Sequence, residues 1–343
     1  MFTTTRTTRT TRTIPRLHSL LHRHRHHSTL RRSYLYVPSS SSKLLEKTLS
    51  FTPSSSPDVI IYDLEDSVSP KKEDKEGARD RLRGFLQQPN IPDPERIAVR
   101  INDVNSPFFA EDVKQILSLP QIRSLILPKI DSAHDLHYVS RHLNQVYQSL
   151  PSSYDRAAPL RIIPSIESPQ ALINLTSIGS WKSDFGEMQG GKVSGLLFAA
   201  EDYCASTSII RTRSRQELLY TRSQIAIAAR AFGLEGIDMV CIHYKDLEYL
   251  KDECEDGRRL GFSGKQAIHP SQVETIQKTF VPTEKEIRRA ALILASMKSA
   301  HDSAKGAIGL EGEMIDAPMI KQAEKIIQIA KEAGLEIPVP KAN

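Results

Sequence analysis

The chain has 343 residues, of which 39% are hydrophobic and 25% are charged. That length exceeds the usual single domain but suits one α/β barrel with an appended segment. No apolar run approaches the ~20 residues of a membrane-spanning helix, so we expect no membrane partner. The three cysteines have no CxxC spacing. They argue against a disulfide framework and a zinc site, and they favour a reducing compartment.

The first 32 residues differ in charge from the rest of the chain. They contain eight arginines and neither lysine nor acid, so the remainder has 46 − 8 = 38 basic residues against 41 acidic ones, a net charge of −3. A basic, acid-free leader rich in serine and threonine is typical of a mitochondrial transit peptide. The alternative is a basic tail that touches nucleic acid, but the acidic remainder argues against a nucleic-acid partner. We therefore predict a transit peptide over residues 1–32 and a location in the mitochondrial matrix.

Eight short apolar runs alternate with amphipathic stretches beyond the leader. The runs cover residues 33–37, 58–63, 97–101, 124–128, 160–166, 195–199, 238–242 and 264–268. Runs that are apolar on both faces are typical of buried parallel strands, which need crossover connections. Residues 134–148 and 216–231 carry apolar stripes at helical spacing. The pattern predicts an α/β fold, a modified TIM (β/α)₈ barrel over residues 33–280.

Residues 281–343 exceed what a barrel needs. We expect a helix through about Met297, a glycine-rich stretch over residues 305–316, and a final helix that opens at Pro318 and stops at Gly334. This C-terminal helical extension is predicted to act as a lid that reaches the active site, in its own chain or in a neighbouring subunit.

Acidic residues gather where the predicted strands end, which is where barrel enzymes carry their chemistry. Glu167 and Asp202 follow adjacent strands, and two carboxylates with water and substrate oxygens are the ligands that Mg²⁺ prefers. The alternative is that Glu167 caps the next helix. Asp63, Glu65 and Asp66 are too crowded to ligate one ion together. We interpret them as residues around the ion that orient metal-bound water.

Other polar side chains extend this set. Glu201 also ends the sixth strand and is placed near the ion. Arg100 ends the third strand and suits either a bidentate clamp for a substrate carboxylate or a structural ion pair across the barrel mouth. Tyr36 ends the first strand. Lys43 and Lys47 lie four residues apart on the following helix, where they form a basic face for phosphates or a solvated face.

Short motifs along the chain resemble, in the same order, those of the citrate lyase beta-subunit/malyl-CoA lyase family of HpcH/HpaI aldolases. They are YVPSSSSKLLEK, DLEDSV, VRIN, LPKI, IPSIESP, AAEDY, SQIAIAARAFGL, GFSGKQAIHPSQV, FVPT and GEMIDAP, and they cover essentially all of residues 33–335. The chain is most similar to the mitochondrial citrate lyase beta-like branch of that family, the citramalyl-CoA lyases. It departs from the family at Ser39, where a glycine is usual, and at Ala199, where AAED replaces GAED.

The resemblance implies a modified barrel, usually trimeric, whose C-terminal segment helps to complete a neighbour's site. It implies Glu167 and Asp202 as the Mg²⁺ ligands, and Arg100 as the residue that binds the carboxylate end of the substrate. The family's contacts to the CoA thioester are matched by Tyr36, Lys43, Lys47, Ile268 and His269. Asp316 resembles the family's catalytic acid or base, although an acid just ahead of a helix also suits an N-cap.

Together these features predict a Mg²⁺-dependent carbon–carbon lyase. It would cleave a small 3-hydroxyacyl-CoA such as (S)-citramalyl-CoA to pyruvate and acetyl-CoA by retro-Claisen chemistry, which is reversible as a malate or methylmalate synthase. The expected partners are a CoA thioester and a 2-oxo acid, and the expected assembly is a homotrimer or a multiple of it. One alternative is a Schiff-base aldolase in which Lys129 attacks a carbonyl, unless Lys129 pairs with the carboxylates around it. Another is a non-catalytic CoA-binding subunit of a larger lyase complex.

Overall fold

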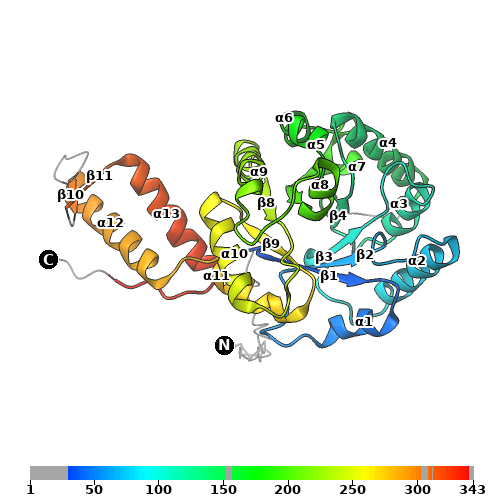
Figure 1. Ribbon diagram of the computed structural model, residues 1–343, viewed down its shortest axis with the longest axis horizontal. Coiled ribbons are helices and arrows are strands. Elements are labelled where there is room, and N and C mark those ends of the chain that lie inside the picture. Colours follow the sequence, from blue (N-terminus) through cyan, green and yellow to red (C-terminus); the bar gives the residue numbers. More distant parts are fainter. Residues whose placement is uncertain (1–29, 152–153, 155–156, 303–307, 311, 340–343) are drawn as a thin grey trace, which may run out of the picture.

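The computed structural model describes residues 30–151, 154, 157–302, 308–310 and 312–339. Residues 1–29 of the predicted leader lie outside this part of the chain. Figure 1 shows a barrel surrounded by helices, with a smaller helical arm to one side. No helix within the described residues is long and apolar enough to cross a membrane.

Eight parallel strands close into a barrel, as the alternating apolar runs predict. They follow one another in the order β4-β3-β2-β1-β9-β8-β7-β5, and β5 pairs back with β4 to close the ring. Their bounds are β1 Ser33–Pro38, β2 Val59–Asp63, β3 Ile97–Arg100, β4 Ser124–Leu127, β5 Arg161–Ile166, β7 Gly195–Phe198, β8 Glu235–Asp238 and β9 Gly264–Ala267. A two-residue strand, β6 (Lys192–Val193), pairs with the start of β5 just ahead of β7. The predicted (β/α)₈ barrel is confirmed.

The strands bury apolar side chains on both faces, which explains their continuous apolar runs. Residues from seven of the strands form one cluster inside the barrel: Tyr34, Val59, Ile61, Ala98, Ile126, Ile163, Leu197 and Ile237. Strand residues that face outward pack with the helices in a second, larger cluster. The barrel is therefore a packed core, and space for a ligand is left at its two ends.

The seventh barrel strand begins three residues earlier than the sequence predicted. The predicted run covers residues 238–242, whereas β8 is Glu235–Asp238. Met239 and Cys241 lie beyond the ladder but are fully buried. Buried residues are apolar whether or not their backbone pairs in a sheet, so the apolar run extended past the strand. Gly236 lies inside the strand but resembles a turn signal, which placed the predicted start too late.

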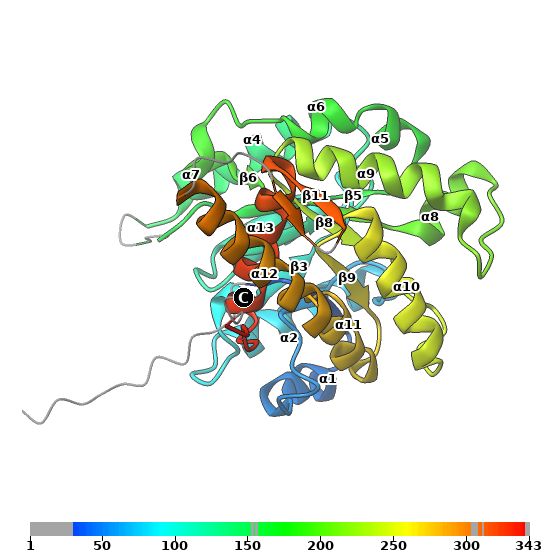
Figure 2. The same cartoon turned by 90° about the vertical axis from the view of Figure 1, so that its left-hand side faces the viewer.

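The crossover segments are helical and cover the outside of the barrel (Figure 2). The helices are α1 Ser42–Lys47, α2 Lys72–Leu86, α3 Phe109–Leu117, α4 Ala133–Ser149, α5 Pro169–Ile173, α6 Leu175–Gly179, α7 Gly186–Gly190, α8 Ala200–Thr207, α9 Leu219–Ala231, α10 Leu247–Leu260 and α11 Val273–Thr279, with 3₁₀ turns at Thr48–Ser50, Pro94–Arg96, Gln216–Leu218 and Pro270–Gln272. The stripe over residues 134–148 is α4, which opens with a capping box between Ser132 and Asp135. The stripe over residues 216–231 is a 3₁₀ turn followed by α9.

Arg31 and Arg32, which the sequence assigned to the leader, contact the barrel. Arg32 donates to Asp58 through Nε and Nη2, both at 2.9 Å, and its backbone carbonyl accepts the Lys265 N–H at 2.7 Å. A Cβ at Gly264 would lie 2.6 Å from the Arg32 carbonyl oxygen and 2.7 Å from that of Arg31. Only glycine lets this segment pass so close to β9. The folded barrel therefore includes the last residues of the predicted leader.

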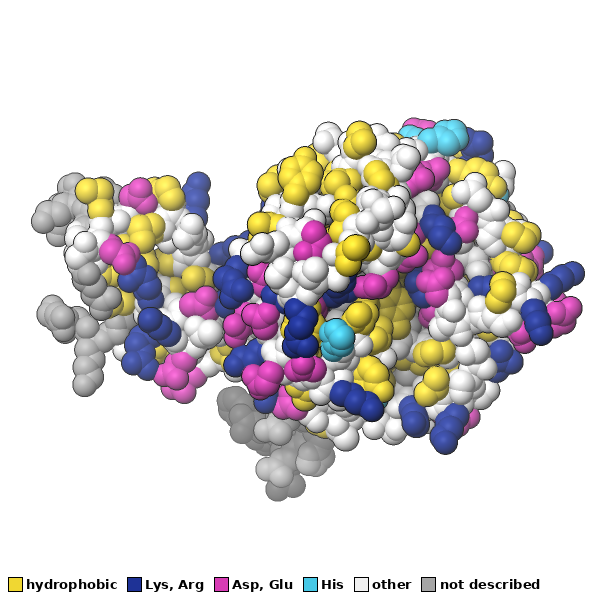
Figure 3. Space-filling view, viewed as in Figure 1, with side chains coloured by type: hydrophobic (Ala, Val, Ile, Leu, Met, Phe, Trp, Pro, Cys, Tyr) yellow, Lys and Arg dark blue, Asp and Glu magenta, His cyan; other side chains and the backbone are white. Residues whose placement is uncertain are grey.

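Residues 284–332 form the arm. Helices α12 (Glu284–Asp302) and α13 (Ala317–Glu332) are connected through the hairpin of β10 (Ile308–Leu310) and β11 (Glu313–Ile315), which lies at the end farthest from the barrel (Figure 1). The arm has an apolar cluster of its own, made of Ile287, Ala290, Ala291, Ile293, Met297, Ile315, Ala323, Ile327 and Ala330. The hairpin falls within the glycine-rich stretch 305–316, of which residues 305–307 and 311 lie outside the described part. Figure 3 shows the arm standing out from the barrel, with basic and acidic side chains interspersed over both.

Candidate active site

A pocket of about 430 Å³ opens where the barrel strands end. It is lined by Tyr36, Pro38, Asp63, Asp66, Ser67, Arg100, Ser165, Ala199, Ala200, Glu201, Asp202, Val240, Gln266 and Ile268. The face of the barrel in Figure 3 is hollowed near its centre, with acidic side chains beside the hollow. Seven of the lining residues are ones that the sequence singled out as site residues. The structure thus brings seven of the thirteen predicted site residues together at the mouth of the barrel.

Arg100, at the end of β3, is held by Asp63, at the end of β2. Asp63 accepts from Arg100 Nε and Nη2, both at 2.7 Å. Burial would raise the pKa of Asp63, but the hydrogen bonds and charge of Arg100 hold it below its ordinary value. Arg100 Nη1 lies 3.0 Å from a carboxylate oxygen of Glu65 and 3.0 Å from one of Asp66. Arg100 thus forms ion pairs across the mouth and also lines the pocket.

Glu65 is a buried carboxyl in this network. Only 6% of it is exposed. Burial raises its pKa to about 7, although Arg100 and Lys129 act in the opposite direction and Asp66 adds to the rise. A carboxyl with a pKa in this range is a candidate for a functional role, because burial and neighbouring charges shift pKa values most often at active sites.

Glu167 follows β5 and lies close enough to Lys129 and Asp202 for their charges to affect it. It is 7% exposed; its Oε1 accepts the Lys129 backbone N–H at 2.5 Å and its Oε2 accepts the Ser165 hydroxyl at 3.0 Å. Burial, and then the charge of Asp202, raise its pKa to about 7. Helix α5 is capped by Ser168, whose Oγ accepts a backbone N–H of that helix at 3.0 Å. The interpretation of Glu167 as a helix cap is therefore wrong.

Asp202 lies in the first turn of α8 and lines the pocket. Burial and the charge of Asp66 raise its pKa above the ordinary value. Within the described residues, no group of three or more histidine, cysteine or acidic side chains is placed to hold a metal. A cation between Glu167 and Asp202 would therefore have two protein ligands and keep several waters, which is how Mg²⁺ is commonly bound.

Lys129, two residues beyond β4, is a charged partner of these acids. Its Nζ lies 3.5 Å from a Glu65 oxygen and 3.8 Å from an Asp103 oxygen. Partial burial acts to lower the Lys129 pKa, but the surrounding carboxylates, Glu65 foremost, raise it above its ordinary value. A Schiff-base lysine needs a lowered pKa to be a nucleophile at neutral pH. The backbone of Lys129 is left-handed (φ 52°), and in this conformation its N–H reaches Glu167.

Gln266 is a residue of the pocket that sequence reasoning missed. It lies in β9, is 2% exposed, and donates through Nε2 to the carbonyls of Phe198 at 2.9 Å and Asp238 at 3.0 Å. Its Oε1 accepts the Tyr36 hydroxyl at 3.0 Å. A glutamine within a buried strand is costly unless it is hydrogen-bonded, and this is the signal that could have identified it.

Four predicted residues have other surroundings. Lys43 and Lys47 are exposed on α1 and do not line the pocket. His269 is exposed next to Ile268, and its Nδ1 accepts the Ser271 N–H at 3.2 Å, which caps a 3₁₀ turn. Glu201 lines the pocket, but its carboxylate pairs with Arg211. Of these four residues, Glu201 alone lines the pocket.

Asp316 is on the arm, immediately before α13. It is exposed, and its side chain makes no capping hydrogen bond within the described residues. It follows β11 at the end of the arm that points away from the barrel (Figure 1). A single chain therefore does not bring Asp316 together with its own Glu167.

Comparison with known proteins gives one consistent family. Residues 32–270 match the HpcH/HpaI aldolase/citrate lyase family. The chain is 32% identical to the mitochondrial citramalyl-CoA lyase of Rattus norvegicus, over 88% of this chain and 86% of that protein. It is similar to the crystal structure of protein CitE from Mycobacterium tuberculosis in complex with magnesium, acetoacetate and coenzyme A, with a TM-score of 0.68 and 26% identity over 90% of this chain and 99% of that one. A citrate lyase from Burkholderia xenovorans LB400 has the same fold, with a TM-score of 0.76 and 20% identity over 90% of this chain and 94% of that one.

Proposed function

The chain belongs to the HpcH/HpaI aldolase/citrate lyase family, and on that premise we propose that it is a Mg²⁺-dependent lyase of a small 3-hydroxyacyl-CoA, with (S)-citramalyl-CoA as the substrate. Membership of this family makes the chain a carbon–carbon lyase. The observation that carries the proposal is the proximity of two carboxylates: Asp202 lines the pocket at the barrel mouth together with Arg100, and its charge acts on the buried Glu167 at the end of β5.

The donor set suits a magnesium ion. Glu167 and Asp202 are oxygen ligands, and the pKa of each is raised by burial and by a neighbouring negative charge. A divalent cation would remove that repulsion and keep both groups ionised. When bound there, Mg²⁺ would polarise the oxygen of the carbon that becomes a ketone.

The residues of the chain would orient the substrate and move its proton. Arg100, fixed by Asp63, would bind the substrate's carboxylate through Nη1, where the substrate would replace the exposed Asp66 as a partner. A base, which we assign to Asp316, takes the proton of the 3-hydroxyl group; the C2–C3 bond then breaks, and its electron pair forms the thioester enolate. The proton that the base removed is then returned to the enolate at C2, which gives acetyl-CoA, and the other fragment is pyruvate. The reverse sequence is a synthase reaction. Tyr36, Lys43, Lys47, Ile268 and His269 would bind the thioester end, at the side of the mouth formed by β1 and β9.

We place Asp316 in the site of a neighbouring chain. Its position at the outer end of the arm supports this, because the hairpin points away from the barrel that carries it (Figure 1). The enzyme would then be a homotrimer, or a multiple of it, in which each arm completes the pocket of the next chain. The small-molecule partners are the CoA thioester and the 2-oxo acid, with neither nucleic acid nor membrane involved.

The proposed location is the mitochondrial matrix. The acid-free basic leader supports it, and the similar protein of Rattus norvegicus is mitochondrial. Residues 1–29 fused to a fluorescent protein should direct it to mitochondria. Diffuse or nuclear fluorescence would contradict this location.

Turnover of free thioesters by the isolated protein tests the function. Citramalyl-, malyl- and citryl-CoA are compared with Mg²⁺ present, with EDTA added, and with the Glu167→Gln variant as the inactive control. We expect pyruvate from citramalyl-CoA as the fastest reaction, and its loss in EDTA. Absence of turnover with all three thioesters would favour the non-catalytic subunit. A lysine adduct trapped by borohydride, together with activity that survives EDTA, would favour the Schiff-base aldolase through Lys129.

A further inference from the structure

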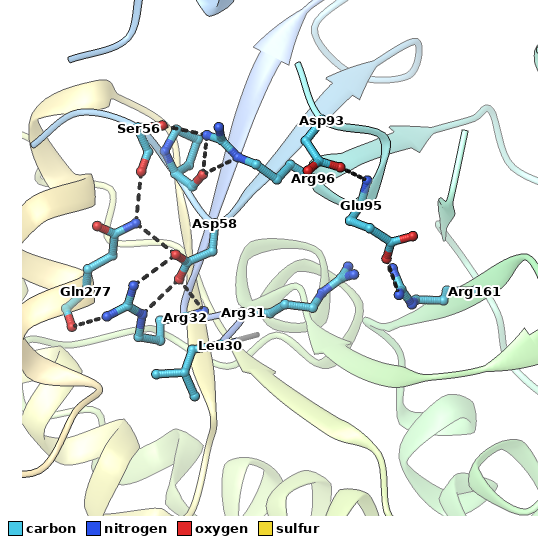
Figure 4. Close-up of a pocket in the computed structure, with 11 residues that line it drawn as sticks. Leu30, Arg31, Arg32, Ser56, Asp58, Asp93, Glu95, Arg96, Arg161 and Gln277 are labelled. Atoms are coloured by element: carbon cyan, nitrogen blue, oxygen red, sulfur yellow. Dashed lines mark hydrogen bonds and ion pairs between the residues drawn. The ribbon is translucent and has the colours of Figure 1, made fainter. Parts of the chain in front are cut away.

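A second cavity, of about 470 Å³, lies at the other end of the barrel, where the strands begin (Figure 4). Four arginines contribute to its lining. Arg31 and Arg32 lead into β1, Arg96 leads into β3, and Arg161 opens β5. Its volume is within the range of small-molecule sites. The proposed lyase reaction uses none of these residues.

The acids of this cavity already have donors. Asp58 accepts from Arg32 Nε and Nη2, both at 2.9 Å, and from the Arg32 backbone N–H at 2.7 Å. Asp93 Oδ1 accepts the Glu95 N–H at 2.9 Å. The Glu95 carboxylate is shared by Arg161 Nη2, at 2.5 Å, and by Arg123 Nε, at 3.5 Å. Of the three lining acids, Asp58 and Glu95 are thus already paired with arginines, and Asp93 is the one without an ion-pair partner among the described residues.

Two of the arginines have a buried donor that no described residue satisfies, and a third has no anionic partner among those residues. Arg31 pairs with Glu235 at 3.3 Å, yet its Nη1 is buried without a hydrogen-bond acceptor in this part of the chain. The Nη1 of Arg161 is likewise buried without a hydrogen-bond acceptor among the described residues. Arg96 donates to the Ser56 hydroxyl and to a backbone carbonyl, both at 2.6 Å, but makes no ion pair with a described carboxylate. In Figure 4 the Arg31 side chain extends toward Glu95 and Arg161 and ends without a partner among the residues drawn.

The charges do not balance either. With the partners Arg123 and Glu235 included, five arginines face four acids. Burial lowers the pKa of Arg96 below its ordinary value, although Asp58 and Asp93 act to raise it. A partly buried cation without an ion-pair partner loses some of its hydration, and a bound anion would offset that cost. The leader cannot provide this anion, because residues 1–32 contain no aspartate or glutamate.

We propose that this cavity is a binding site for a small oxyanion, either a phosphate or a dicarboxylate, held by Arg31, Arg96 and Arg161. The planar guanidinium groups match the geometry of carboxylate and phosphate oxygens, with two donors directed at two acceptors. The bound anion ties together the segments that enter β1, β3 and β5, so its effect is to stabilise the barrel at the end opposite to the active site.

Thermal unfolding and titration calorimetry of the full chain test the proposal. Potassium phosphate and succinate are titrated separately at constant ionic strength, with KCl as the control salt. We expect a saturable rise in Tm and one anion bound per chain, and the tighter of the two probes identifies the chemical class. Arg96→Gln and Arg161→Gln should each weaken binding by about tenfold or more. Arg141→Gln, which removes an exposed arginine of α4, should bind as the wild type does.

The outcomes separate this site from other sources of stabilisation. Arg96→Lys keeps the positive charge but loses the two parallel N–H donors of the guanidinium group, so it should bind the anion with intermediate affinity. This variant also tests the site if the glutamine variants do not fold. Glu167→Gln should bind the anion normally, whether or not the lyase proposal holds. Three results would overturn the inference: no binding, a rise in Tm that KCl reproduces, or unchanged binding in the Arg96 and Arg161 variants.

Discussion

The Tyr36 hydroxyl donates to Gln266 Oε1 at 3.0 Å, while the Tyr36 ring lies 4.8 Å from the guanidinium carbon of Arg100. Gln266 is itself fixed by two backbone carbonyls. The glutamine therefore positions the tyrosine, and the tyrosine offers an aromatic face to the arginine that we assign to the substrate's carboxylate.

This arrangement predicts a graded response at Tyr36. Tyr36→Phe keeps the ring over Arg100 and removes only the bond to Gln266, so kcat/KM should fall by less than about tenfold. Tyr36→Leu removes the ring face as well and should lower kcat/KM by a further factor of about ten. Steady-state kinetics with citramalyl-CoA measure both variants, and thermal unfolding verifies that each is folded. Equal losses in the two variants would mean that the hydroxyl itself acts on the substrate.

Glu167→Gln and Asp202→Asn should weaken Mg²⁺ binding and lower turnover by about 10³-fold or more. A neutral amide cannot replace the charge of a ligand in a two-carboxylate site. Calorimetric titration with Mg²⁺ and the citramalyl-CoA assay measure the two effects. Glu201→Gln is the matched control, because its carboxylate pairs with Arg211; it should bind Mg²⁺ nearly normally. Activity close to wild type in either ligand variant, without excess metal, would remove that residue from the metal site.

Without metal, the stability of the protein should fall between about pH 4.5 and pH 7. Glu65 and Glu167 have pKa values raised from 4.5 to about 7 in the folded chain. The folded state therefore keeps protons that the unfolded state releases, so the stabilisation is complete below the unfolded pKa and is lost as pH rises through the folded one. Each group should contribute on the order of 1–3 kcal/mol. Unfolding in EDTA at several pH values measures the slope.

Glu167→Gln should make that slope shallower, because the amide does not titrate. Saturating Mg²⁺ should do the same or reverse it, since the ion binds the ionised carboxylates. A slope that is equal in the wild type and in Glu167→Gln would show that burial of this carboxyl has no effect on stability.

Asp316→Asn should bind Mg²⁺ and thioester nearly normally and lose turnover by ~10²–10⁴-fold, because asparagine keeps the shape but not the proton transfer. Mixing Asp316→Asn with Glu167→Gln, under conditions that let subunits exchange, should restore part of the activity. Each mixed assembly then holds sites with both residues intact. Exchange without recovery would place the whole site in one chain, and full activity of Asp316→Asn would exclude it from the reaction.

Removal of residues 1–29 should leave kcat and Tm unchanged, whereas removal of residues 1–32 should destabilise the barrel. The longer deletion breaks the Arg32–Asp58 pair, of which both side chains are largely buried, and leaves Asp58 uncompensated. A broken buried pair costs about 3–5 kcal/mol. Differential scanning calorimetry of the two truncated chains, with Arg32→Gln in the full chain as control, measures this cost. Equal Tm values for the two truncations would refute the anchoring role of Arg32.

The sequence predicted what depends on one-dimensional pattern. The eight apolar runs predicted the barrel fold. The polar residues at the strand ends, including Asp63, Arg100 and Asp202, predicted the position of the pocket, because parallel strands bring their carboxyl ends to one side of the barrel. The start of β8 was misplaced because apolarity reports burial and not pairing. The contacts of Arg31 and Arg32 were missed for another reason: their partners are distant in sequence, so no local pattern signals them. A glutamine inside an apolar run does mark Gln266 as unusual, but its partners are also distant in sequence and could not be predicted.

The arm buries its apolar side chains within itself, and this has a consequence for heat inactivation. Ile287, Met297, Ile315 and Ile327 pack with one another and not with the barrel core. Such a small unit buries a smaller fraction of its surface on folding than the barrel does, so its free energy of unfolding is expected to be lower. If Asp316 must be delivered by an intact arm, activity would disappear at a temperature at which the barrel is still folded. On cooling, refolding of one short helical pair would restore the enzyme, without passage through the unfolded barrel.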